Sequence, residues 1–378
     1  MGSIADELAT IPYFRRVPQR ELAKAAGLWT STALAPGEVM WAQGEAVAEI
    51  GILIFGELSA LVDGHEVGRV LPPEIIGEAS AFFAGSQRSA TLRAKKSSQL
   101  LTLPVTGLRT LRWQRSALYE ALLEQALLAL VRRVRATDAR IAQVARGDAA
   151  APARTEPSAL VRLWKALRPG GPTTKVPALE PLLLQQPGLR DLPPEDAEAL
   201  AEAFVPEPVA EGQIIFLEGD DGAAMYVVAD GQIDVLRHVR GERAEVLASL
   251  RAGHQFGANT LVEKGTRTAS CVAATPGWIY RMDAEAFAGL KGNVRLLWRE
   301  SVLATLATQI RNANSALNKA SGTTRTSAAR TSAAREDGFK QLLKASGYLE
   351  GAGVNDEELE RMEVVIDEDQ KRNPKNRR

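Results

Sequence analysis

The sequence predicts a mainly β protein with flanking helices, built as two copies of one antiparallel domain that each end in a long α-helix. Short apolar runs alternate with glycine-containing turns, which is typical of antiparallel barrels and sandwiches. The glycine spacing then recurs after about 175 residues, which indicates two copies of one domain. The matching glycines are Gly37 and Gly212, Gly44 and Gly219, Gly56 and Gly231, and Gly77 and Gly257.

The first copy begins with helical segments over residues 4–8 and 19–27, followed by the strand-rich region. A strand over residues 99–103 precedes a long helical pattern over residues 106–145. The apolar positions of that helix follow steps of four, three, four, seven and three, a heptad seam typical of a coiled coil. They are Leu123, Leu127, Leu130, Val134, Ile141 and Val144, with Thr137 filling the polar gap.

The second copy repeats this order. A helical region over residues 182–204 includes a helix opened by Pro193 and Pro194, and residues 279–282 form a strand. The long helix that follows carries a second seam at Leu296, Leu303, Leu306, Ile310, Ala313 and Leu317. The later turns of both helices extend beyond what one small domain can cover. We therefore expect each to pack on a partner helix, from a second chain or from the same chain.

The remaining stretches have the composition of connections and tails. Residues 147–157 are rich in alanine and proline, and residues 320–335 repeat Thr-Ser-Ala-Ala-Arg with few large apolar side chains, so disorder is expected there. The predicted domain map has two domains, each with its long helix, over 1–146 and 179–320. A linker with a short helix over 147–178 joins them. A disordered linker over 321–337 and a short helical, charged tail over 338–378 follow the second domain.

Composition narrows the function classes. The chain has 46 basic and 46 acidic residues, so no bulk attraction to nucleic acid or to an acidic membrane is expected. A single cysteine, Cys271, excludes an internal disulfide framework, and the absence of a signal peptide or long apolar run predicts a cytoplasmic protein. Three scattered histidines give neither metal-ligand spacing nor a catalytic triad, so we expect no enzyme activity and no metal.

The candidate site is a carboxylate followed ten positions later by a guanidinium, Glu78 and Arg88, with glycine and small residues around them. An isolated pair of this kind is usually a solvated surface pair, but here the upstream pattern occurs twice. Arginine binds phosphate through two parallel charge-assisted hydrogen bonds, and free N–H groups at the start of a short helix after Gly77 favour an anion. The candidate residues are Gly77, Glu78, Ala79, Arg88, Ser89 and Ala90.

The second copy has an altered version of this motif. Ala258 occupies the glutamate position, and Arg267 follows nine positions later. The candidate residues of this weaker site are Gly257, Asn259, Arg267, Thr268 and Ala269.

Both segments resemble the phosphate-binding cassette of the cyclic-nucleotide-binding domain family, whose fold is an antiparallel, jelly-roll-like β-roll. The resemblance implies that Arg88 pairs with the phosphate, that Glu78 accepts a hydrogen bond from the ribose 2′-hydroxyl, and that Ser89 and Ala90 support the phosphate. It favours cyclic AMP in the first domain, whereas Thr268 is similar to members that prefer cyclic GMP. Since a methyl group cannot accept a hydrogen bond, Ala258 predicts weak binding or none in the second domain.

The resemblance implies a cytoplasmic cyclic-nucleotide sensor without cofactor, whose ligand is cyclic AMP or cyclic GMP. A homodimer through the long helices is expected, and contacts with nucleic acid or membrane are not. Two alternatives remain open. One is a structural or interaction protein with ligand-free β-rolls. The other is a transcriptional regulator with an unrecognised DNA-binding element in the tail, which ends in a basic run.

Overall fold

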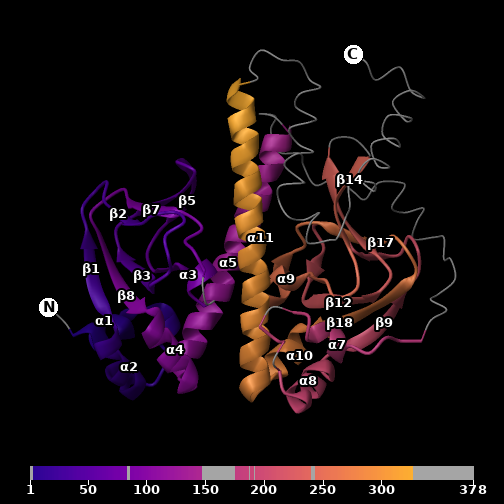
Figure 1. Cartoon of the computed structure of the whole chain (residues 1–378), viewed down its shortest axis with the longest axis horizontal. Helices are drawn as coiled ribbons and strands as arrows, with labels where there is room; N and C mark the ends of the chain where they lie inside the picture. The colour runs from indigo at the N-terminus through magenta and orange to yellow at the C-terminus, as the bar shows by residue number, and fades with distance from the viewer. Residues whose placement is uncertain are drawn as a thin grey trace.

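Two β-rolls lie on either side of a pair of long helices (Figure 1). The computed structural model describes residues 3–82, 86–146, 175–186, 188–190, 192–239 and 243–326. Most of the predicted first linker, the low-complexity stretch from residue 327 and the charged tail lie outside the described residues.

Each β-roll consists mainly of two four-stranded antiparallel sheets. In the first domain the strand orders are β1-β8-β3-β6 and β2-β7-β4-β5. The strands are β1 Thr30–Leu34, β2 Val39–Trp41, β3 Glu49–Phe55, β4 Leu58–Val62, β5 His65–Val70, β6 Glu74–Ile76, β7 Thr91–Ala94 and β8 Ser98–Pro104.

The second domain repeats this topology with the orders β9-β18-β12-β15 and β10-β17-β13-β14, and it adds a small β11-β16 pair. Its strands are β9 Val205–Val209, β10 Ile214–Phe216, β11 Asp221–Gly222, β12 Ala224–Asp230, β13 Ile233–Val239, β14 Arg243–Leu250, β15 Gln255–Phe256, β16 Gly265–Thr266, β17 Ser270–Ala273 and β18 Gly277–Asp283. The predicted tandem of antiparallel β domains is therefore confirmed.

Short helices bracket both β-rolls, as the sequence predicts. Before and within the first domain these are α1 Ile4–Thr10, η1 Pro12–Phe14, α2 Gln19–Ala25, η2 Ala26–Leu28 and α3 Glu78–Ala81. In the second domain they are α7 Glu180–Leu183, α8 Pro194–Ala201, α9 Ala258–Val262 and α10 Ala284–Gly289. The helix α8 begins at Pro194, where the fixed φ of proline suits a first turn.

The single long helix expected over residues 106–145 is two helices, α4 Val105–Trp113 and α5 Ala117–Arg146. The break has a local cause, because Arg115 adopts a left-handed conformation with φ of 49°. The new helix then begins with capped N–H groups. The side chain of Ser116 accepts from the N–H of Leu118 at 3.2 Å, and Glu21 of α2 accepts from the N–H of Ala117 at 3.0 Å.

The second long helix, α11, covers Gly292–Thr326 and so extends beyond residue 320, where we expected disorder to begin. Apart from Gly322, the residues over this extension include no strong helix breaker. The two long helices run in the same direction side by side (Figure 1). Trp298 and Val302 of α11 and Leu122 and Leu130 of α5 are all fully buried in one apolar cluster shared by the two domains.

The partner helix expected for each seam is thus the other helix of the same chain. Charged pairs strengthen the contact near its beginning. The guanidinium of Arg112 donates two hydrogen bonds to Glu300, at 2.6 and 2.8 Å, and Arg295 pairs with Glu120. A homodimer through these helices stays a prediction. The seam positions up to Val134 of α5, and Leu303, Leu306 and Ile310 of α11, are buried within the chain.

Among the described helices, none combines the length and the apolar character needed to cross a membrane.

Candidate functional site

The first candidate site begins at a left-handed glycine. Gly77, with φ of 78°, joins β6 to the one-turn helix α3. A Cβ at this position would lie 2.5 Å from Nη1 of Arg88 and 3.0 Å from the ring of Trp41. Both the backbone conformation and the space therefore favour glycine, and its absent side chain lets the guanidinium of Arg88 lie close to the backbone.

Arg88 is a buried cation with unfilled hydrogen-bonding capacity. The residue is only 5% exposed, and its guanidinium lies over the Trp41 ring at 3.5 Å from the centroid. Nη2 donates to the carbonyl of Glu49 at 2.8 Å, but Nε and Nη1 are buried and have no partner among the described residues. Burial lowers the pKa of Arg88 to about 10. An anion bound here would relieve this unfavourable state.

Glu78 is fully buried at the start of α3 and is half-paired. Its Oε1 accepts from Nη1 of Arg133, a residue of α5 that also binds Glu74 at 2.9 Å. The second carboxylate oxygen, Oε2, is buried without a partner among the described residues. Burial raises the pKa of Glu78, and the Arg133 charge opposes that shift. Oε2 of this carboxylate therefore has the capacity to accept one further hydrogen bond.

A cavity of about 480 Å³ lies between the β-roll and the helix pair, within the roughly 300–1,000 Å³ typical of small-molecule sites. It is lined by all the predicted residues of the first site except Glu78. The cassette contributes Gly77, Ala79, Arg88, Ser89 and Ala90, α5 contributes Gln125, Arg133 and Thr137, and α11 contributes Ile310. The site is therefore composite, since its wall includes a helix of the second domain.

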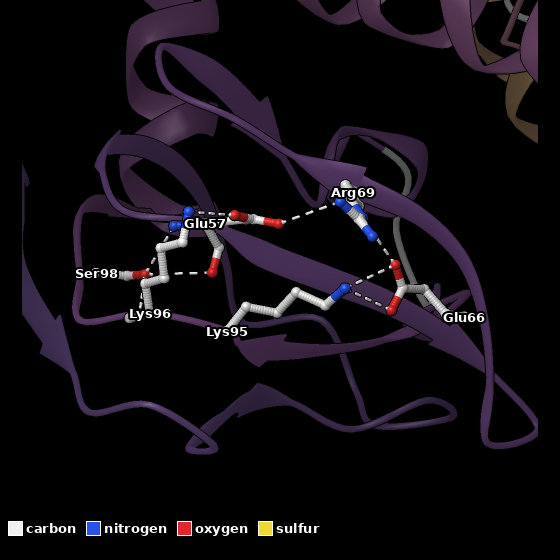
Figure 2. A network of polar contacts seen from close by, with 6 residues as sticks. All are labelled: Glu57, Glu66, Arg69, Lys95, Lys96 and Ser98. Atoms are coloured by element: carbon white, nitrogen blue, oxygen red, sulfur yellow. Dashed lines mark hydrogen bonds and ion pairs between the residues drawn. The ribbon is translucent and has the colours of Figure 1, made fainter.

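Arg69 also lines this cavity, but its charge is engaged at the rim. Its guanidinium contacts Glu66 at 3.2 Å and Glu57 at 3.8 Å, and the side chain is 64% exposed. Figure 2 shows these contacts within a surface network that Lys95 and Lys96 complete. Of these two arginines, Arg88 is therefore the one that is buried and has unpaired N–H groups among the described residues.

The second candidate site has the same frame but a different interior. Gly257, with φ of 77°, begins α9, and Arg267 lies over Phe216 with its guanidinium carbon 4.0 Å from the ring centroid. Here two guanidinium nitrogens donate hydrogen bonds to the main-chain carbonyls of Gly257 and Ala224, each at 2.9 Å. Arg267 therefore ties α9 to β12 within the protein, and only Nε lacks a partner among the described residues.

The cavity between the second cassette and α11 has a volume of about 110 Å³, far below the roughly 300–1,000 Å³ of small-molecule pockets. A separate pocket of about 470 Å³, lined by Asp220, Asp221 and Arg281, also includes Arg267. Val302, Thr305 and Leu306 of α11 form one wall of the smaller cavity. The predicted residues Gly257, Asn259, Arg267, Thr268 and Ala269 all line it, together with Ala258 and Cys271. The structure thus brings the second set together around a space that is nearly filled.

Sequence reasoning missed Arg133, Trp41 and Ile310. The arginine pairs with the cassette carboxylate from a helix 55 residues away, and the isoleucine comes from the other domain. The one sequence signal for Arg133 is the charged run Arg132-Arg133-Val134-Arg135 inside an amphipathic helix. The described residues contain no group of three or more His, Cys, Asp or Glu side chains that could hold a metal.

Comparison with known proteins identifies the two β-rolls. A family model described as "Cyclic nucleotide-binding domain" matches residues 32–114 and 206–292. Each β-roll therefore contains a stretch that matches the cyclic nucleotide-binding domain family.

The chain is similar to two kinds of regulator over about a third of its length. It is 30% identical over 128 residues to the cyclic AMP receptor protein of Thermus thermophilus, covering 34% of this chain and 59% of that protein. It is 29% identical over 120 residues to the cAMP-dependent protein kinase regulatory subunit of Schizosaccharomyces pombe, covering 32% of this chain and 28% of that protein. The matches thus span well under two thirds of these relatives.

A solved structure, the regulatory domain of Toxoplasma gondii PKA with cAMP, aligns over 78% of this chain and 94% of its own, with 17% identity and a TM-score of 0.28. A score this low adds nothing to the assignment made from the sequence matches.

Proposed function

We propose that the chain is a non-enzymatic, cytoplasmic sensor of a cyclic mononucleotide, which binds in the first cavity with cyclic AMP favoured over cyclic GMP. The buried, partly unpartnered guanidinium of Arg88 supports this most strongly. A cyclic phosphodiester carries one negative charge, which matches one uncompensated cation, and it would remove the cost of leaving buried donors unpaired.

Other groups in the cavity, and Glu78 next to its lining residues Gly77 and Ala79, suit the rest of such a ligand. The ribose 2′-hydroxyl would donate to Oε2 of Glu78, the oxygen that lacks a partner among the described residues. The base would then lie against α5 and Ile310 of α11, where Gln125 and Thr137 offer polar groups. Binding would in this way connect the cassette with both long helices, and a ligand shifts a conformational equilibrium only through unequal affinity for the two states.

For the second domain we propose a structural role, with weak binding of cyclic nucleotide or none. The small volume of its cavity and the carbonyl partners of Arg267 support this, in addition to Ala258 at the acceptor position. The homodimer stays a prediction, and the tail in which we considered a DNA-binding element lies outside the described residues.

Isothermal titration calorimetry of the full chain tests the proposed function. We expect one site per chain, tighter for cyclic AMP than for cyclic GMP, because the cavity between the second cassette and α11 is far smaller than the first cavity. The control ligand is 5′-AMP, whose open, doubly charged phosphate should bind more weakly at a site with one uncompensated cation. Absence of binding heat for both cyclic mononucleotides would refute the proposal, and two sites of equal affinity would refute the structural role of the second domain.

We also expect binding to depend on pH through Glu78. Burial raises the pKa of Glu78 above its ordinary value of 4.5. The hydroxyl of the bound nucleotide donates to the ionised carboxylate and so favours it. Molecules in which Glu78 is protonated must therefore release that proton when the nucleotide binds. Affinity should therefore fall as the pH is lowered through this raised pKa and stay flat well above it. Calorimetry between pH 7 and pH 5 measures this, and the Glu78→Gln variant should bind more weakly with no such dependence. A wild-type affinity that rises on acidification would contradict the assignment.

A further inference from the structure

One turn of α5 makes ion pairs with the cassettes of both domains. Arg133 binds Glu78 and Glu74 in the first domain. Its neighbours bind Glu263 in the second domain, Arg132 at 2.7 Å and Arg135 at 3.0 Å. Successive helical residues point about 100° apart, so this short run of arginines can reach to both sides of the helix.

The contact with the second cassette is more than a surface ion pair. Glu263 directly follows α9, and Arg135 also donates to its main-chain carbonyl at 2.9 Å. Two residues further on, a Cβ at Gly265 would lie 3.0 Å from the Arg135 guanidinium. Arg135 therefore holds the connection between α9 and Arg267, and both ends of this connection line the second cavity.

A second contact runs in the opposite direction. Arg311 of α11 donates to the main-chain carbonyl of Ala79, in the first cassette, at 3.1 Å. Each long helix thus presents an arginine to the cassette of the other domain. Any coupling carried by these contacts must be reciprocal, because linkage between two sites acts equally in both directions.

We propose that the arginine turn formed by Arg132, Arg133 and Arg135 couples the two cassettes, so that a ligand in the first cavity holds the second cavity closed. The inference rests on the function proposed above. A ligand hydroxyl on Oε2 of Glu78 keeps that carboxylate ionised and strengthens its pair with Arg133. This pair holds the arginine turn in place. The contacts of Arg132 and Arg135 with Glu263 are thereby maintained.

The chain contains its own reporter for this coupling. Cys271 is the single cysteine in the sequence, is 2% exposed and lines the second cavity. Its thiol can react with a reagent only when the second cavity opens, so the labelling rate measures the population of the open state.

The experiment is labelling of Cys271 with iodoacetamide, followed by mass spectrometry, on the full chain with and without saturating cyclic AMP. In the wild-type protein we expect the nucleotide to slow labelling about fivefold, within the roughly 5- to 150-fold range of typical coupling. In Glu263→Gln, labelling without nucleotide should be faster and the effect of the nucleotide should vanish. Because the coupling is reciprocal, Glu263→Gln should lower the affinity of the first site for cyclic AMP by no more than about fivefold.

Two further variants distinguish coupling through the arginine turn from general loosening of the helix pair and from direct shielding of the thiol by nucleotide. Arg295→Gln removes an ion pair with Glu120 between the same two helices but away from the cassettes, so it should keep the effect of the nucleotide. Arg88→Ala should abolish it. Slowing that persists in Arg88→Ala would mean direct shielding of Cys271 and would overturn the coupling, as would equal slowing in wild type and Glu263→Gln.

A ligand-independent test keeps this inference distinct from the proposed function. If calorimetry shows no nucleotide binding, the proposed function fails, and the coupling is then judged from the labelling rates of Glu78→Gln, Glu263→Gln and the double variant without ligand. Non-additive effects of about threefold or more would support a coupled turn, because independent sites give additive effects. Additive effects would overturn it.

Discussion

Replacing Arg88 with alanine should weaken the binding of cyclic AMP by roughly 2–5 kcal/mol, because the phosphate would then be desolvated in the cavity without its counter-charge. This corresponds to a loss of about 30-fold to several thousandfold in affinity, since about 1.4 kcal/mol is a factor of ten. The guanidinium is the right group to remove. It is 5% exposed, and the Trp41 ring and the close backbone of Gly77 fix its position.

Arg69→Ala is the matched control for this experiment. It removes an arginine that lines the same cavity, but one that is 64% exposed and paired with Glu66 and Glu57, so its effect on affinity should be small. Arg88→Lys should recover only part of the affinity, because an ammonium group lacks the planar fork that binds two phosphate oxygens. Calorimetry on the three variants measures these differences. Unchanged affinity in Arg88→Ala would rule out this guanidinium as the phosphate group.

The parts of the site that could be predicted are those that are local in sequence. Gly77, Glu78 and Arg88 lie within a dozen positions of one another, and their spacing fixes their relation once the turn forms. The contributions of Arg133 and Ile310 depend on where two helices pack, and no local pattern encodes that. The same reason applies to the second site. The sequence shows that Ala258 offers no side-chain acceptor, but it does not show that α11 forms a wall of a small cavity there.

The predicted helix seams show a similar limit. Leu303, Leu306 and Ile310 are buried as the heptad steps imply, whereas Leu296 is only partly buried and the fully buried Trp298 falls outside the steps. A strict heptad describes one narrow contact, but α11 packs on α5 and also on the helices of its own domain. Its buried face is therefore wider than a two-helix seam.

Trp298 should account for a large share of the stability of this helix pair. It is fully buried in the shared apolar cluster and meets Phe204 edge to face, with ring centroids 5.6 Å apart. Its indole N–H has no hydrogen-bond partner among the described residues, so its contribution comes from packing. Trp298→Ala should lower the free energy of unfolding by about 3–5 kcal/mol, the usual cost of removing a large aromatic side chain from a core.

Guanidinium chloride denaturation, followed by circular dichroism, measures this change. Trp113→Ala is the matched control, because Trp113 is 88% exposed at the end of α4 and its loss should change the free energy of unfolding by no more than about 0.5 kcal/mol. Trp298→Phe should lower the free energy of unfolding less than Trp298→Ala does, because most of the ring volume remains and no hydrogen bond to a described residue is lost. Because α11 also supplies Ile310 to the first cavity, Trp298→Ala should weaken nucleotide binding as well. Equal stability of Trp298→Ala and Trp113→Ala would contradict a core role for Trp298 and, with it, the tight packing of α11 against both domains.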